Sequence, residues 1–288
     1  MSLPFRQVNV FSSNPTGGNP VAVVHDADGL TDDQMAAFAR WTNLSETTFL
    51  LTPTDAGADY RVRIWTPGGE LPFAGHPTLG TAHAWLEAGG APAGTDVVQE
   101  CSVGLVRLRR EAVGDGHRLA FAAPPLIRSG AVDDADVAQI AKSLRIDVSD
   151  VVRSAWVDNG PGWVAVQLQD ADAVLALEPD FAVMGDLRLG VVGEYGIGVV
   201  GEEYATGEPA VEVRAFVPSL GTGEDPVTGS LNAGLGQWLA GEVLPSSYIA
   251  SQGTALGREG RVHVDKLPDG EVWVGGDTLT TIVGQVGF

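Results

Sequence analysis

Short strand-like runs of apolar and alternating residues dominate the chain and predict a large amount of β-structure. Alternation puts every second side chain on the buried face of a sheet. The 38 glycines and 17 prolines are spread through the sequence and fit the many turns of such a fold. The clearest runs are RQVNVF (6–11), VAVV (21–24), TTFLL (47–51), YRVRIW (60–65), VRLRR (106–110) and RLAFA (118–122).

Two segments have helical spacing instead. In LTDDQMAAFARWT (30–42) the apolar residues recur at roughly helical intervals, Thr31 is a suitable N-cap, and acids occupy the first turn. PTLGTAHAWLEAGG (77–90) predicts a second helix, which the closing glycine pair would end.

The second half of the sequence repeats the order of motifs in the first. SAWVDNGPGWVAVQLQDADAVLAL (154–177) resembles FSSNPTGGNPVAVVHDADGL (11–30), and VRAFVP (213–218) resembles VRIWTP (62–67). A glycine-rich loop and a helix containing Trp-Leu follow each Val-Arg strand. The repeat distance of roughly 150 positions is far longer than a solenoid period. We therefore expect an internal duplication that produces two similar mixed α+β halves.

The expected N-terminal half comprises residues 1–118, with a last strand at about 277–288 that returns to it, and the C-terminal half comprises residues 119–276. Equivalent loops of two pseudo-symmetric halves would face each other across a cleft, where small-molecule sites are common.

Charge and cysteine content narrow the function classes. The net charge of −20, with 37 acidic against 17 basic residues, argues against nucleic acid or an anionic membrane surface as a partner, because both need basic patches. The single cysteine, Cys101, excludes an intrachain disulfide framework and any multi-cysteine metal site. The start of the sequence has no apolar signal region, and no run approaches 18 apolar residues. We expect a cytoplasmic protein.

The sequence patterns do not predict a dinucleotide-binding site or a metal site. GIGVVG (196–201) fits a dinucleotide pattern, but EEYATGEP (202–209) cannot supply the helix that must follow it, so we interpret its glycines as turn residues. The histidines are scattered, and His76 and His83 have no acidic ligand pattern beside them. No cofactor and no metal site are predicted.

The loops after the two Val-Arg strands are the best candidates for a binding site. TPGGELPFAGHPTLG (66–80) leads into a helix with Pro77 near its first turn, and VPSLGTGEDPVTGSLNAGL (217–235) leads into a helix preceded by Gly229 and Ser230. Each helix start offers backbone N–H groups and the positive end of the helix dipole, which suit a carboxylate or phosphate. The two together would hold an anion in an acidic protein.

Two acids near these loops are candidates for acid–base chemistry. Asp225 precedes a proline that keeps its backbone extended. Glu46, in NLSETTF (43–49), stands between a helix and an apolar strand. A carboxylate that is partly buried there becomes a usable general base near neutral pH. Taken alone, each residue also fits a solvated surface acid.

Together these segments resemble the phenazine-biosynthesis PhzF-like isomerase/epimerase family, which shares the diaminopimelate-epimerase fold. The order and spacing of the matching motifs run through nearly the whole chain. One departure is NPTGGNP in the first turn, where family members often have an aromatic residue after Asn-Pro, so the pocket wall near Thr16 is expected to differ. The matching segments are 11–24, 44–51, 63–86, 213–239, GREGRVHVDK (257–266) and VWVGGDTLTTIVGQV (272–286).

The resemblance implies two halves, each a β-barrel-like sheet wrapped around a central helix, with the active site between them, and a homodimer. It also implies cofactor-independent proton transfer at carbon, with Glu46 as the principal base. Cys101 lies outside both loops, so two-thiol racemisation is excluded. The remaining residues carried over are His76 and Asp225 as catalytic groups, and Asn19, Gly75, Gly229 and Ser230 as substrate-binding groups.

The expected reaction is a proton shift or epimerisation on a small anionic metabolite that carries a carboxylate. In this hypothesis His76 either transfers a proton or only positions the substrate. Two alternatives stay open: a lyase or hydratase that uses the same acid–base residues, and a small-molecule-binding member of the fold without chemistry.

Overall fold

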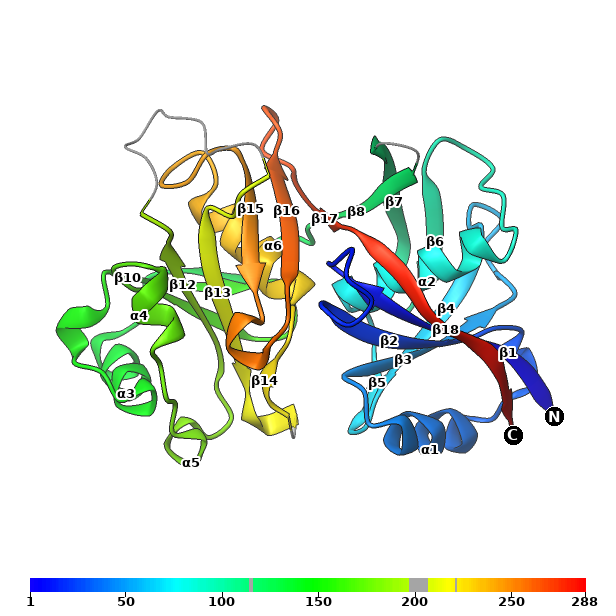
Figure 1. Ribbon diagram of the computed structural model, residues 1–288, viewed down its shortest axis with the longest axis horizontal. Helices are drawn as coiled ribbons and strands as arrows, with labels where there is room; N and C mark the ends of the chain where they lie inside the picture. Colours follow the sequence, from blue (N-terminus) through cyan, green and yellow to red (C-terminus); the bar gives the residue numbers. More distant parts are fainter. Residues whose placement is uncertain (114–115, 197–206, 221) are drawn as a thin grey trace. The chain divides into compact units, whose positions relative to one another are not determined.

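The computed structural model describes the 288-residue chain except residues 114–115, 197–206 and 221. The chain forms two compact units (Figure 1): unit 1 contains Met1–Ala122 and Gly275–Phe288, and unit 2 contains Ala123–Val274. The chain passes from one unit to the other at 122/123 and 274/275, whereas the sequence placed these boundaries at 118/119 and 276/277.

Unit 1 contains nine strands and two α-helices among its described residues. The strands are β1 (Ser2–Val10), β2 (Asn19–Val24), β3 (Glu46–Leu51), β4 (Tyr60–Thr66), β5 (Gly69–Leu71), β6 (Val97–Cys101), β7 (Gly104–Val113), β8 (Gly116–Ala122) and β18 (Thr278–Gly287). The helices are α1 (Asp32–Thr42) and α2 (Gly75–Glu87), and a short 3-10 helix covers Ala27–Gly29.

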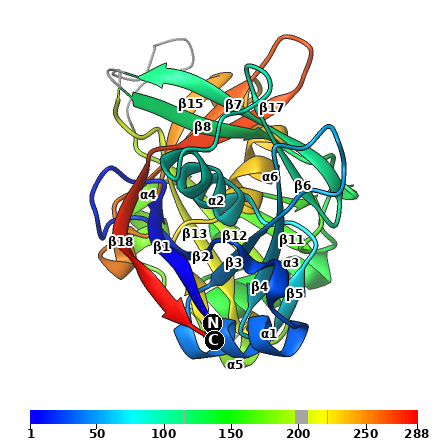
Figure 2. The same cartoon turned by 90° about the vertical axis from the view of Figure 1, so that its right-hand side faces the viewer.

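The strands of unit 1 surround α2, which contacts β1, β2, β3, β6, β8 and β18 (Figure 2). Residues 75–82 of this helix are all buried, as expected for a helix enclosed on every side. Gly80 permits the close approach, because a Cβ there would lie 2.4 Å from Cγ1 of Val21. The prediction of a central helix is confirmed for this unit, and α1 begins at its predicted N-cap, Thr31, whose hydroxyl accepts from Gln34 N.

The elements of unit 2 follow the same plan. Its strands are β9 (Arg128–Gly130), β10 (Arg153–Asp158), β11 (Trp163–Gln167), β12 (Arg188–Glu194), β13 (Val211–Val217), β14 (Gly223–Asp225), β15 (Ser247–Gln252) and β16 (Gly260–Lys266), and β17 (Val272–Gly276) reaches the boundary. The helices are α3 (Asp134–Leu144), α4 (Ala171–Leu175), α5 (Phe181–Met184) and the buried α6 (Gly229–Leu239), with 3-10 turns at Val148–Asp150, Pro218–Leu220 and Thr254–Leu256.

Strand pairing repeats between the units in order and in sense. In unit 1, β1–β2 is antiparallel, β2–β3 parallel, β3–β4 and β4–β5 antiparallel, β4–β6 parallel and β6–β7 antiparallel. In unit 2, the same series runs through β10–β11, β11–β12, β12–β13, β13–β14, β13–β15 and β15–β16. The predicted duplication is therefore visible in the strand pairing, and the α+β fold class is confirmed.

Each unit also repeats an arginine clamp. Arg63 of β4 donates from Nε and one terminal nitrogen to the two carboxylate oxygens of Glu70 on β5, both at 2.7 Å. Arg214 of β13 binds Glu224 on β14 in the same way, at 2.9 and 2.7 Å. These two-point ion pairs fix the short return strand that precedes each candidate loop, since an arginine–carboxylate fork constrains position and angle.

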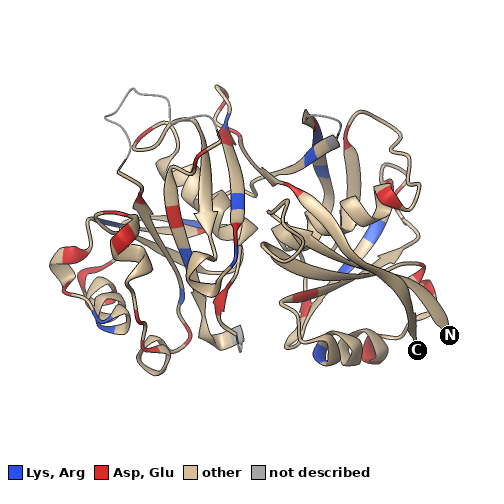
Figure 3. Ribbon diagram, in the orientation of Figure 1, with Lys and Arg blue, Asp and Glu red and all other residues tan. Residues whose placement is uncertain are grey.

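Acidic residues are spread over many elements of both units (Figure 3). In the described part of the chain, no helix combines the length and the apolar character needed to cross a bilayer.

Candidate functional site

The predicted residues of unit 1 gather where β2, β3 and α2 begin. Asn19 is the first residue of β2, Glu46 is the first residue of β3, and His76 is the second residue of α2. Parallel pairing of β2 with β3 sets Glu46 opposite Val21. The Nδ1 atom of His76 lies 3.3 Å from Oε2 of Glu46 and 3.5 Å from Nδ2 of Asn19. Three groups from separate parts of the sequence therefore meet at one point.

His76 is held as a neutral imidazole. Its side chain is only 4% exposed, and that of Glu46 is 14% exposed. Burial lowers the pKa of His76 from 6.5 to about 3, while a backbone hydrogen bond with Pro20 partly opposes this shift. The Nδ1 atom of this neutral ring faces both the Glu46 carboxylate and the Asn19 side-chain amide. The other ring nitrogen, Nε2, is buried and has no hydrogen-bond partner among the described residues.

The start of α2 corrects one sequence-based expectation. The sequence placed the helix start at Pro77 and left Gly75 and His76 in the preceding loop, but the helix already begins at Gly75. The Ala74 N-cap makes no side-chain capping bond to this first turn in the described structure. The sequence could not show this, because proline marks the first turn without fixing which residue opens the helix.

The predicted residues of unit 2 lie at the junction of β14 and α6. Asp225 ends β14, Thr228 is the N-cap of α6, and Gly229 and Ser230 are its first two residues rather than residues before the helix. Oδ2 of Asp225 accepts a hydrogen bond from the Thr228 hydroxyl at 2.5 Å. A side-chain hydrogen bond therefore joins Asp225 to the N-cap of α6.

Ser230 is oriented by two residues that the sequence analysis did not single out. Nε1 of Trp163 donates to the Ser230 hydroxyl oxygen at 2.9 Å, and Nδ2 of Asn159 donates to the Ser230 carbonyl at 2.9 Å. The indole bond occupies a lone pair of the hydroxyl, which keeps its own proton for a second bond. This geometry suits an acceptor such as a carboxylate. The repeat of NPVAV and GWVAV was the one signal that pointed to this turn.

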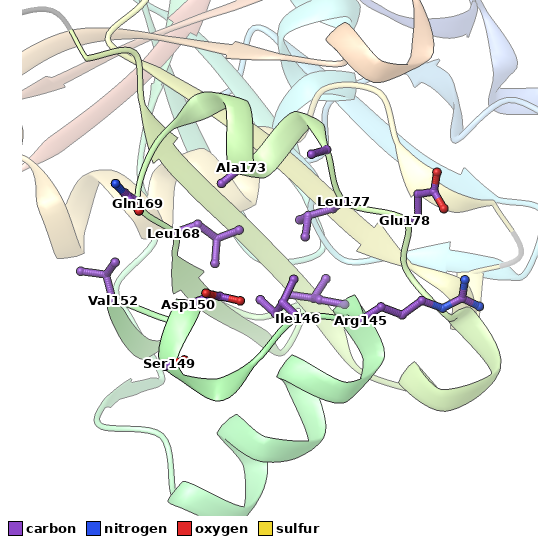
Figure 4. Close-up of a pocket in the computed structure, with 12 residues that line it drawn as sticks. Arg145, Ile146, Ser149, Asp150, Val152, Leu168, Gln169, Ala173, Leu177 and Glu178 are labelled. Atoms are coloured by element: carbon purple, nitrogen blue, oxygen red, sulfur yellow. The ribbon is translucent and has the colours of Figure 1, made fainter.

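Unit 2 also contains a cavity of about 600 Å³, shown in Figure 4. Its apolar lining includes Leu168 and Leu177, and two of its charged side chains have partners within unit 2: Arg145 pairs with Asp180, and Asp150 accepts from Asp147 N. None of the predicted site residues lines it, so we do not assign the chemistry to this cavity. The lining residues are Leu144, Arg145, Ile146, Ser149, Asp150, Val152, Leu168, Gln169, Ala173, Ala176, Leu177 and Glu178.

A metal site is not evident in the part of the chain that the structure describes: no three His, Cys, Asp or Glu side chains gather there as ligands would. Most of GIGVVG, residues 197–201, lies outside the described residues.

The buried His76 predicts a specific dependence of stability on pH. Its pKa in the folded protein, about 3, lies below the unfolded value of 6.5, so the unfolded chain binds the extra proton between these values. The free energy of unfolding therefore has its full contribution from the neutral ring above pH 6.5. It falls by about 1.4 kcal/mol per pH unit as the pH drops from 6.5 toward 3. Urea unfolding of the parent and of His76→Gln between pH 7 and pH 4 should show a flatter dependence in the variant. Equal slopes would contradict the neutral, buried imidazole.

Comparison with known proteins places the chain in a family. The family model for phenazine biosynthesis-like protein matches residues 8–284. Antisense-enhancing sequence 1 of Schizosaccharomyces pombe is 37% identical over 98% of this chain and 97% of its own length. The trans-2,3-dihydro-3-hydroxyanthranilate isomerase of Pseudomonas aeruginosa is 34% identical over 92% of this chain and 90% of its own length.

The fold agrees with this assignment. A crystal structure of a Bacillus anthracis phenazine biosynthesis protein of the PhzF family superposes with a TM-score of 0.83, covers both chains completely and has 23% sequence identity. With a family model that spans nearly the whole sequence and relatives that align from end to end, this chain belongs to the phenazine biosynthesis-like protein family.

Proposed function

We propose that this protein is a cofactor-independent isomerase that moves a proton between carbon atoms of a small, carboxylate-bearing metabolite. The observation that carries the proposal is the contact between the largely buried carboxylate of Glu46 and the neutral imidazole of His76. The isomerase name of the Pseudomonas aeruginosa relative supports the same reaction class. Epimerisation is the same chemistry with a proton returned to the opposite face of the carbon that lost one.

In the proposed reaction, Glu46 accepts a proton from a carbon next to an unsaturated or carbonyl group. The electron pair of the broken C–H bond moves into that conjugated system, and a proton is then returned to another carbon, so the product has the mass of the substrate. The neutral imidazole of His76 lies 3.3 Å from the Glu46 carboxylate and orients it. Nε2 of His76, which has no hydrogen-bond partner among the described residues, is available to bind a substrate hydroxyl or to transfer a proton.

We assign substrate binding to groups that match an anion. The Ser230 hydroxyl retains a proton to donate, and the backbone N–H groups at Gly75 and Gly229 belong to the first turns of buried helices. Asn19 contacts the His76 ring and is assigned to its orientation. That these groups and Asp225 act on one substrate molecule stays a prediction, as do the cytoplasmic location and the homodimer.

The test is solvent exchange at carbon. We expect the protein in D₂O to introduce deuterium into trans-2,3-dihydro-3-hydroxyanthranilate, or into another member of a panel of small cyclic and amino acids, with exchange followed by NMR. Mass spectrometry of the product should show deuterium as the only change in mass.

The other outcomes separate the alternatives. A product that has lost or gained water or another fragment would indicate a lyase or hydratase. Ligand-induced shifts of protein signals without any C–H exchange would indicate a binding protein, and either result would overturn the isomerase proposal.

A further inference from the structure

Gln252, at the end of β15, is fully buried and lies at the centre of a hydrogen-bond network under the Asp225 loop. Its Oε1 accepts from Thr228 N at 3.0 Å and from Nδ2 of Asn232 at 2.8 Å. Its Nε2 donates to the Thr228 hydroxyl oxygen at 3.0 Å and to the Asp225 carbonyl at 3.2 Å. One amide therefore contacts the acid, the helix N-cap and the first turns of α6.

The direction of these bonds follows from chemistry. A backbone N–H can only donate, so the amide atom facing Thr228 N must be the oxygen. The other amide atom is then the NH₂ group, which can only donate, and Thr228 Oγ1 must accept from it. The hydroxyl proton of Thr228 is left to point at Oδ2 of Asp225, 2.5 Å away. The network thus has a fixed order, from Gln252 to Thr228 to Asp225.

We propose that Gln252 is a positioning residue for Asp225, acting through the Thr228 hydroxyl and through the Asp225 carbonyl. The inference rests on the proposed function, because only that function gives Asp225 a part in the reaction. One bond orients a carboxylate oxygen and the other fixes the backbone that carries the acid, so both the location and the rotation of the carboxylate depend on this amide. Residues that set the geometry of a reacting group affect turnover more than ground-state binding.

The test compares Gln252→Met, Thr228→Val and Thr228→Ser with the parent. Methionine keeps the size and removes the amide, and valine keeps the shape and removes the hydroxyl, whereas serine retains the hydroxyl. We expect kcat to fall about tenfold in the first two variants, with KM changed less than threefold, and serine to restore most of kcat. Ser251→Ala is the matched control, because Ser251 is an equally buried neighbour on the opposite face of β15.

Combined variants separate positioning from simple destabilisation. If Gln252 acts on Asp225, Gln252→Met should have no further effect on kcat in an Asp225→Asn background, since coupled residues are non-additive. An equal tenfold loss in both backgrounds, or an equal loss in Ser251→Ala, would overturn the inference. If Asp225→Asn retains full activity while Glu46→Gln does not, the inference fails and the proposed function stands.

A structural measurement needs no substrate and covers the case in which no activity is found. In crystal structures of the parent and of Gln252→Met, we expect the Asp225 carboxylate to leave the Thr228 hydroxyl in the variant. A carboxylate that keeps its position and its contact with Thr228 in the variant would overturn the positioning role.

Discussion

Replacing Glu46 by glutamine is expected to lower kcat by about 10²–10⁴-fold, because one positioned acid–base group typically contributes that much to the rate. Glutamine keeps the size of the side chain and can keep its place beside Nδ1 of His76, which is 3.3 Å from the carboxylate in the parent. It cannot accept a proton from carbon. We therefore expect a loss of turnover with an unchanged fold, measured as kcat by product formation and as folding by circular dichroism.

Glu100 provides a matched control in the same unit. Its side chain is 15% exposed, close to the 14% of Glu46, and it accepts hydrogen bonds from the backbone N–H groups of Thr54 and Asp55. Glu100→Gln should leave kcat unchanged and alter only stability. Activity of Glu46→Gln within twofold of the parent would remove Glu46 from the mechanism.

Replacing Arg214 by methionine is expected to lower the free energy of unfolding by about 3–5 kcal/mol. The side chains of Arg214 and Glu224 are only 7% and 8% exposed, so the substitution would leave the Glu224 carboxylate buried without its charge partner. It would also remove the donor to the Leu177 carbonyl, 2.8 Å away. Urea unfolding followed by fluorescence measures this loss.

Two further variants test the cause. Arg214→Met combined with Glu224→Met should regain much of the stability, because a buried ion pair can often be replaced by apolar residues at little cost. Arg63→Met, in the more exposed clamp of unit 1, should cost less, since its side chain is 19% exposed and that of Glu70 is 30% exposed. A loss below 1 kcal/mol for Arg214→Met would contradict the uncompensated buried charge.

The local sequence predicted many of the strands and the helices α1, α2 and α6, but it did not predict α3, α4 or α5. Alternation marked the strands, and the helical spacing after Thr31 marked α1 together with its N-cap. The repeated order of motifs was sufficient to predict the duplication. Two halves with the same strand pairing need strands, turns and helices in the same order along the chain. Glu46 and His76 were found because their motifs resemble those of a known family, and the structure brings the two side chains together.

The positions of helix starts were less predictable. Pro77 was expected near the first turn of one helix, and Gly229 and Ser230 were expected before the other, but the helices begin earlier, at Gly75 and Gly229. Glycine has low intrinsic helix propensity, so a local pattern favours loop at these positions. Tertiary packing overrides that preference, since both glycines are buried within their units.

The sequence by itself determined the α+β class, the repeat and the identity of the candidate acids, since these depend on residue types and on spacing along the chain. Only the tertiary structure decided the protonation state of His76 and the orientation of the side chains in the site. His76 is neutral because residues distant in sequence exclude water from it, and Asn19 contacts it across 57 positions. Gln252 reaches Thr228 across 24 positions, and it orients Asp225 through a contact that only folding creates.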